Sequence, residues 1–240
     1  MFNNELIKKY NINPTPYEIQ EQGNWNWETF KNLLIECTFE DNGNKLMGMN
    51  IVFMQHYYKM ALMSNGANLV KYEDGKYVFG LDDEKAYETF DYIKELARLK
   101  VTKEDYDVGN FSLRNMYFFM SCESWLGTVN VENDILPTLH MEDWGFITFP
   151  NGPKADANNV SSFVYVDDRL NWIVGPSYND KNDLGLLVDY IFKPLDGTSK
   201  QAWKEFAHSQ FFHSDETYNN FINMIENCQY DYSTELYDVR

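Results

Sequence analysis

The sequence predicts an α/β protein with a mainly parallel sheet, because short apolar runs alternate with long stretches of helical periodicity. The run "LMGMNIVFM" at 46–54 is typical of a buried strand, and "LDDEKAYETFDYIKELARLK" at 81–100 is the clearest helix in the chain. No internal repeat of about 20 to 50 residues is visible, so a repeat architecture is not indicated.

The first well-defined helix is predicted from about Trp27 to Cys37. Asn26 is a good N-cap, and Glu28 in the first turn is favoured by the positive end of the helix dipole. Apolar residues then recur at the helical spacing of a single buried stripe. The members of this stripe are Phe30, Leu33, Leu34 and Cys37.

Turn signals separate the elements that follow. The stretch "EDNGNK" at 40–45 predicts a turn before the buried strand. The segment after that strand predicts a helix that stops at Asn65-Gly66. Asp74-Gly75 lies between two short extended pieces, which is the signal of a β-hairpin.

The long helix at 81–100 begins with acidic residues and ends with basic ones, as the helix dipole favours. Its predicted buried face consists of Ala86, Phe90, Ile93 and Ala97.

Beyond the long helix, the pattern predicts one helical turn at 111–115 and a polar, hinge-like loop at 151–159. Further strands are predicted at 116–122, 144–150 and 170–175, and further helices at about 181–193, 199–208 and 214–228. Ser214 is the predicted N-cap of the last helix, whose apolar face is Tyr218, Phe221, Ile222 and Ile225.

The chain is strongly acidic. Asp and Glu number 37 against 20 Lys and Arg, which gives a net charge of −17 spread over the whole length. Such a surface repels phosphate backbones and anionic lipid heads, so we expect no nucleic-acid partner.

The longest apolar runs fall far short of the roughly 18 residues of a membrane-spanning helix. The N-terminal segment does not have the pattern of a secretory signal peptide, so either the chain is cytosolic or a leader has been removed.

Reactive side chains do not form a recognisable catalytic motif. The histidines are badly spaced for a metal site, and the three cysteines are widely separated. The common nucleophile and phosphate-loop motifs are missing, and no two acids pair convincingly as a glycosidase requires. Aromatic residues make up 17% of the chain, and together with the many carboxylates and amides they suit a polyol ligand. No metal or cofactor is expected.

Several longer segments occur in a characteristic order: "NPTPYEIQEQGNWNWETFKNLL", "MALMSNGANLVKYEDGKYVFGLDDEKAYETFDYIKEL", "NFSLRNMYFFMSCESW", "WGFITFPNGPKAD" and "NWIVGPSYNDKNDLGLLVDYIF". Each is degenerate, but the set and its order are specific. Together they resemble the bacterial extracellular solute-binding proteins, family 1, which deliver sugars to ABC transporters. The resemblance covers nearly all of the 240 residues.

The resemblance implies a periplasmic-binding-protein-like fold of type II, which has two lobes. Residues 1–165 would form a largely complete second lobe, an α/β domain. Residues 166–240 would form the hinge crossing and a helical segment of the first lobe. The strand-rich N-terminal part of the family's first lobe has no counterpart in this sequence.

The function that the resemblance implies is non-catalytic. The protein would bind a carbohydrate, in particular an oligosaccharide, for an ABC-type importer by closing two lobes around it. An ABC permease would be the partner of a full-length protein, and the location would be extracellular or at the cell surface. Another chain covering the missing lobe is a further expected partner. The alternative is that the lobe serves as a structural or protein-interaction module in a larger assembly, with exposed aromatic side chains covered by a partner.

The resemblance also implies a set of ligand-binding residues. Trp125 stands where a maltose-binding member of the family has a tryptophan that stacks on the sugar. Gln55, His56, Tyr57 and Tyr58 lie near a sugar-contacting Glu-Pro-Tyr segment of that protein. Both His56 and Tyr57 are candidates for its aromatic contact.

The stretch "GNWNWETF" at 23–30 sets two indoles two positions apart where a helix begins. Trp25 and Trp27 could form a platform for a ligand or could pack at the entrance of the helix. Because the family carries a Trp-x-Trp pair at a helix start in its second lobe, we expect the packing role.

Overall fold

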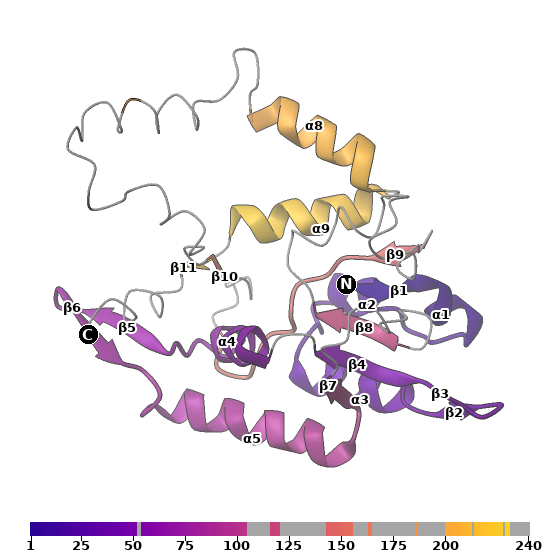
Figure 1. Ribbon diagram of the computed structural model, residues 1–240, viewed down its shortest axis with the longest axis horizontal. Helices are drawn as coiled ribbons and strands as arrows, with labels where there is room; N and C mark the ends of the chain where they lie inside the picture. Colours follow the sequence, from indigo (N-terminus) through magenta and orange to yellow (C-terminus); the bar gives the residue numbers. More distant parts are fainter. Residues whose placement is uncertain are drawn as a thin grey trace.

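A five-stranded sheet with helices packed around it forms the centre of the protein (Figure 1). The computed structural model describes residues 1–51, 54–104, 116–120, 143–155, 163–164, 186, 200–212, 214–227 and 229–230. The sheet has the strand order β7-β4-β8-β1-β9. Its strands are β1 (Phe2–Asn3), β4 (Met47–Ile51), β7 (Thr102–Glu104), β8 (Met116–Met120) and β9 (Trp144–Gly145).

Three neighbouring strands of this sheet run in the same direction. β4 pairs in parallel with both β7 and β8, and Ile51 lies opposite Glu104 on one side and Met120 on the other. β1 runs antiparallel to β8 and to β9. The carboxyl ends of β4, β7 and β8 therefore lie along one edge of the sheet.

The helices that the structure describes are α1 (Asn4–Lys9), α2 (Pro16–Glu21), α3 (Trp27–Glu36), α4 (Met54–Ser64), α5 (Glu84–Leu99), α8 (Lys200–Phe211) and α9 (Asp215–Glu226). Five of them, α3, α4, α5, α8 and α9, begin and end close to the predicted positions, whereas α1 and α2 were not predicted. Asn26 caps α3 as predicted, because its side-chain oxygen accepts hydrogen bonds from the backbone N–H groups of Glu28 and Thr29. Ser214 caps α9 in the same way by accepting from the N–H of Thr217. α4 stops immediately before Asn65-Gly66, as predicted.

Two β-hairpins extend from the body. They are β2 (Glu40–Asp41) with β3 (Asn44–Lys45), and β5 (Val70–Glu73) with β6 (Lys76–Phe79). The second turn has positive φ at both Asp74 and Gly75, which matches the preference of Asp-Gly for tight hairpin turns. This confirms the predicted hairpin. In the described part of the chain, each hairpin pairs only with itself.

The buried face of α5 differs from the prediction. The structure buries Ala86, Thr89, Tyr92, Ile93 and Leu96. Phe90 is half-buried and Ala97 is exposed, so the prediction of Ala97 in the core is wrong. The helix turns its larger side chains, Tyr92 and Leu96, into the main hydrophobic core, because they remove more apolar area from water than a single methyl group does.

The strand predicted at 144–150 is shorter than expected. β9 ends at Gly145, and the backbone N–H of the next residue, Phe146, donates to the Tyr17 hydroxyl at 3.0 Å instead of continuing the sheet. The strand predicted at 116–122 is described up to Met120 and is confirmed to that point. The predicted elements at 111–115 and 170–175 lie outside the described residues, as does the helix at 181–193 apart from residue 186.

The main core lies where α3, α4 and α5 pack on the sheet. Its fully buried members include Phe2, Ile7, Leu34, Met49, Tyr57 and Leu96. Cys37 belongs to the same cluster and is a buried free thiol, which confirms its expected role as a small apolar side chain.

α9 packs beside the β9 end of the sheet. The ring of Phe221 meets that of Phe146 edge to face at 5.4 Å between centroids. The Tyr17 hydroxyl lies 2.9 Å from Thr217 Oγ1, and burial raises the pKa of Tyr17 to about 12. Among the helices that the structure describes, there is no candidate for a membrane-spanning segment.

Candidate functional site

The tryptophan pair at the start of α3 packs inside the protein. Trp25 Nε1 donates to the backbone oxygen of Thr148 at 2.8 Å, and Trp27 Nε1 donates to Ser64 Oγ at 3.0 Å. The Trp27 ring stacks on Tyr92 with 4.3 Å between centroids and 5° between planes. Both indoles are buried, so the predicted packing role is confirmed.

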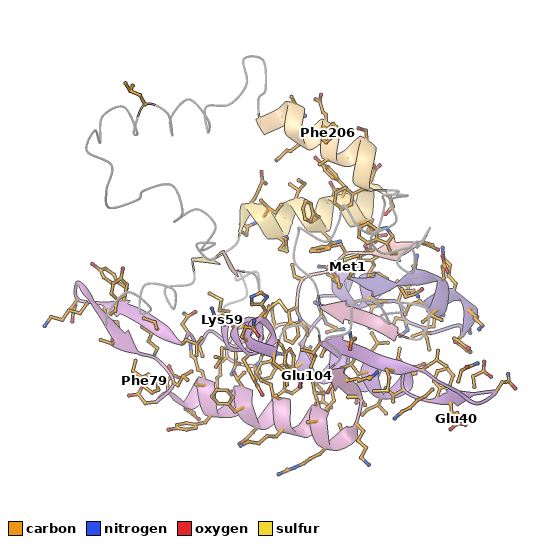
Figure 2. All side chains as sticks on the ribbon, viewed as in Figure 1. Met1, Glu40, Lys59, Phe79, Glu104 and Phe206 are labelled. Carbon is orange, nitrogen blue, oxygen red and sulfur yellow. The ribbon has the colours of Figure 1, made fainter. Side chains whose placement is uncertain are left out.

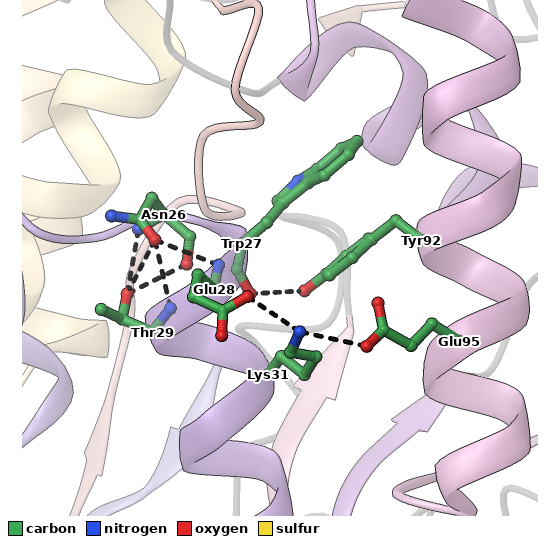
Figure 3. A network of polar contacts seen from close by, with 7 residues as sticks. All are labelled: Asn26, Trp27, Glu28, Thr29, Lys31, Tyr92 and Glu95. Atoms are coloured by element: carbon green, nitrogen blue, oxygen red, sulfur yellow. Dashed lines mark hydrogen bonds and ion pairs between the residues drawn. The ribbon is translucent and has the colours of Figure 1, made fainter.

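A network of polar contacts holds the same helix start against α5 (Figure 3). The Tyr92 hydroxyl donates to the backbone oxygen of Trp27 at 3.0 Å. The Lys31 ammonium lies 2.8 Å from Glu28 and 3.1 Å from Glu95, which ties one turn of α3 to α5. These contacts hold α3 against α5, so this region has a structural role and is not an open ligand platform.

The predicted ligand residues on α4 divide between surface and core. Gln55 is exposed, and His56 and Tyr58 are half-buried. Tyr57 is only 1% exposed and belongs to the main core. Because consecutive residues of a helix point in directions about 100° apart, one turn cannot present all four side chains to one ligand. His56 is thus the more accessible of the two alternatives, His56 and Tyr57.

The Tyr57 ring is enclosed by other aromatic rings. It meets Phe149 at 6.1 Å and Tyr58 at 6.0 Å between centroids. Burial raises the pKa of Tyr57, and its hydroxyl has no hydrogen-bond partner within the described part of the chain. Tyr57, Ala61 and Ser64 are spaced so that they lie on one face of α4, and all three are buried. This spacing is the sequence signal from which the buried position of Tyr57 could have been predicted.

Two buried tyrosines give matched variants with different expected results. Tyr92→Phe should lower the free energy of unfolding by about 1 kcal/mol, because it removes a hydrogen bond to Trp27 O. Tyr57→Phe should leave stability unchanged or raise it, because the deleted hydroxyl has no described partner. Urea denaturation of both variants measures the difference, and an equal loss in the two would contradict these contacts.

Tyr58 lines an open groove between α4 and α5 that sequence reasoning did not identify. The groove has a volume of about 380 Å³, within the range of about 300–1,000 Å³ that is typical of small-molecule sites. Phe90 meets Tyr58 edge to face at 6.3 Å. The lining residues are Tyr58, Tyr87, Phe90, Asp91, Ile93 and Lys94.

The predicted ligand residues lie in two segments that begin at one edge of the sheet. One segment follows the carboxyl end of β4, and the other follows the carboxyl end of β8. Gln55 and His56 follow Ile51, the last residue of β4, by four and five residues. Trp125 follows Met120, the last residue of β8, by five residues, and it lies outside the described residues. Because Ile51 and Met120 are register partners, both segments start from neighbouring points of one edge.

Asn50 lies one residue before the end of β4 and is fully buried. Neither atom of its side-chain amide has a hydrogen-bond partner in the part of the chain that the structure describes. The sequence signal for this buried amide was a polar residue inside the apolar run "MGMNI". Asn50 was not singled out from the sequence. An unpaired buried amide is costly, which makes Asn50 unusual for a central strand.

Among the described residues, no three His, Cys, Asp or Glu side chains come together as a metal site. His208 instead lies 2.9 Å from Asp215 and stacks on Tyr218, while His140 and His213 lie outside the described residues.

No protein-family model matches this chain, and no curated protein matches it significantly.

Proposed function

We propose that this chain binds a carbohydrate without chemically altering it, at the carboxyl edge of β4 and β8. The observation that carries the proposal is the parallel register of Ile51 with Met120. In open α/β sheets, ligands bind outside the carboxyl ends of the strands, where the following loops converge. Here that edge gives rise to both segments that the resemblance assigns to the ligand.

The residues near this edge offer the chemistry that a sugar requires. Gln55 is exposed and its amide can both donate to and accept from hydroxyl groups. Trp125 would supply an aromatic face for the ring C–H groups. A fully extended chain can carry Trp125 no more than about 18 Å from Met120, so the indole and Gln55 are within reach of one oligosaccharide.

Closure of two lobes and delivery to an ABC permease belong to the same proposal and rest on the resemblance. A ligand drives closure only by binding the closed state more tightly than the open state. Under this proposal, residues 1–165 hold one side of the sugar, and the opposite side meets the first lobe or another chain.

Calorimetric titration with neutral oligosaccharides tests the proposal. The panel comprises malto-, cello- and xylo-oligosaccharides, titrated against the unaltered chain, Trp125→Ala and Gln55→Ala. Each substitution should weaken the binding of the preferred sugar by roughly 1 kcal/mol, or about fivefold.

Two further variants serve as controls for the location of the sugar. Tyr72→Ala removes an exposed aromatic ring on the β5–β6 hairpin and should leave the affinity unchanged. Tyr87→Ala removes a ring of the α4–α5 groove, and a loss confined to this variant would place the sugar there and contradict the proposed site. Absence of binding by every member of the panel would contradict the function itself.

A further inference from the structure

The β5–β6 hairpin carries three exposed aromatic side chains on one face. In its register, Tyr72 lies opposite Tyr77, and Val70 lies opposite Phe79. Alternate residues of a strand share a face, so these four side chains lie on the same side of the hairpin. Tyr72 is 54% exposed, Tyr77 46% and Phe79 67%, whereas Val70 is buried and anchors the base. We call Tyr72, Tyr77 and Phe79 the aromatic face.

The hairpin stands apart from the central sheet (Figure 2). It projects at the left of the view, with Phe79 at its base beside the start of α5. Its two strands pair only with each other in the described part of the chain. The ion pair of Lys71 with Asp83, at 2.8 Å, ties it to the N-cap of α5. A two-stranded hairpin has marginal stability in water, so covering its aromatic face would stabilise it.

The surroundings of the aromatic face are acidic. Residues 71–84 contain five acidic and two basic residues, a net charge of 5 − 2 = 3 negative charges. Lys71 is already paired with Asp83, and Lys76 lies opposite Glu73 in the hairpin register. The whole chain carries a charge of −17, so the local field adds to that of the molecule.

We propose that the aromatic face is a docking surface for a basic polypeptide segment of a partner protein. Guanidinium and ammonium groups bind to the faces of tyrosine and phenylalanine rings. The Tyr72 and Tyr77 rings, 5.0 Å apart, form a pair over which such groups can lie. Exposed carboxylates such as Glu73 and Asp74 at the turn then attract the remaining positive charges of the segment.

Charge decides between this partner and other occupants. A second copy of the chain would bring together two molecules that each carry −17, and an anionic membrane surface would be repelled for the same reason. A basic segment is instead attracted by the negative charge of the chain. The surface is distinct from the proposed sugar site, so it extends the function from a soluble ligand to a protein partner.

Binding of a synthetic peptide rich in Arg and Lys to the full chain tests the proposal. Fluorescence anisotropy of the labelled peptide should show saturable binding that weakens as salt is added. The double variant Tyr77→Ser with Phe79→Ser should lose about fivefold to tenfold in affinity. A peptide of the same length with Asp and Glu in place of the basic residues should not bind.

Matched variants separate docking at the hairpin from general attraction to an acidic protein. Ile35→Ser removes an exposed apolar side chain on α3 and should bind the peptide as the unaltered chain does. Glu73→Gln with Asp74→Asn should weaken binding and flatten its salt dependence, whereas Glu36→Gln with Glu40→Gln, also exposed, should have less effect. Equal losses in the hairpin variants and these controls would overturn the proposal.

Two further measurements keep the result interpretable. Thermal unfolding should show that each variant remains folded, with a slightly lower midpoint for the serine double variant because it loses the ring contact between Tyr72 and Tyr77. If the serine double variant does not fold, Phe79→Ser alone carries the test, with about a twofold loss expected. Sedimentation that showed a dimer of the unaltered chain, abolished by Phe79→Ser, would overturn the basic partner in favour of a second copy.

Discussion

Replacing Gly48 with alanine is expected to lower the free energy of unfolding by about 3 kcal/mol, although it adds only one methyl group. Gly48 lies in β4, beneath α3. A Cβ atom at this position would lie 2.7 Å from the Leu34 backbone oxygen and 3.0 Å from the Val101 backbone oxygen. These are backbone atoms of α3 and of the residue before β7, so they cannot rotate away as the end of a side chain could. Urea denaturation measures the loss.

Gly43→Ala is the matched control for this prediction. Nothing lies within 4 Å of a Cβ atom at Gly43, so its only cost is the φ of +81°. That cost is about 1–2 kcal/mol, and the variant should therefore be more stable than Gly48→Ala. If Gly48→Ala were as stable as the unaltered chain, the close approach of α3 to β4 would be wrong.

Asn65→Ala is expected to destabilise the protein by a similar amount, about 3 kcal/mol, because the buried Asn65 amide joins three segments. Its nitrogen donates to the Lys85 backbone oxygen at 3.0 Å and to Glu88 Oε2 at 3.1 Å. Its oxygen accepts from the backbone N–H of Lys154 at 2.9 Å. The substitution leaves these partners without the amide and removes one of the links between the loop after β9 and the end of α4, where the backbone hydrogen bond from Gly152 to Ser64 remains.

Two measurements check the role of Asn65. Urea denaturation gives the loss of stability, and hydrogen exchange should show the Lys154 amide exchanging faster relative to amides of the central sheet. Asn219→Ala, on the exposed side of α9, is the matched control and should change stability by less than about 0.5 kcal/mol. Equal effects of the two substitutions would contradict the role of the Asn65 amide in linking these three segments.

Local sequence signals predicted the elements whose structure depends on neighbouring residues. Asn26 caps α3 through N–H groups two and three residues away, and Asp74-Gly75 forms its turn through its own backbone angles. Contacts between distant residues were not predictable. β9 is short because Phe146 donates to Tyr17, which is 129 residues away in sequence.

The candidate site was predictable only in part. The resemblance pointed to Trp125 and to the segment from Gln55 to Tyr58, and the parallel pairing of β4 with β8 then related the starting points of the two segments. The inward direction of Tyr57 follows from helical periodicity and could have been inferred. The unpaired amide of Asn50 and the α4–α5 groove depend on tertiary packing, which a single sequence does not reveal.

The most direct test of the proposed sugar site is ¹⁵N–¹H NMR of the six tryptophan indole N–H groups during titration with each oligosaccharide of the panel. The indoles of Trp25 and Trp27 are internal references, because their N–H groups are held by Thr148 O and Ser64 Oγ. We predict that the Trp125 signal shifts and saturates with one class of sugar while the two reference signals stay in place. A Trp125 signal that does not move with any sugar would contradict the proposed site.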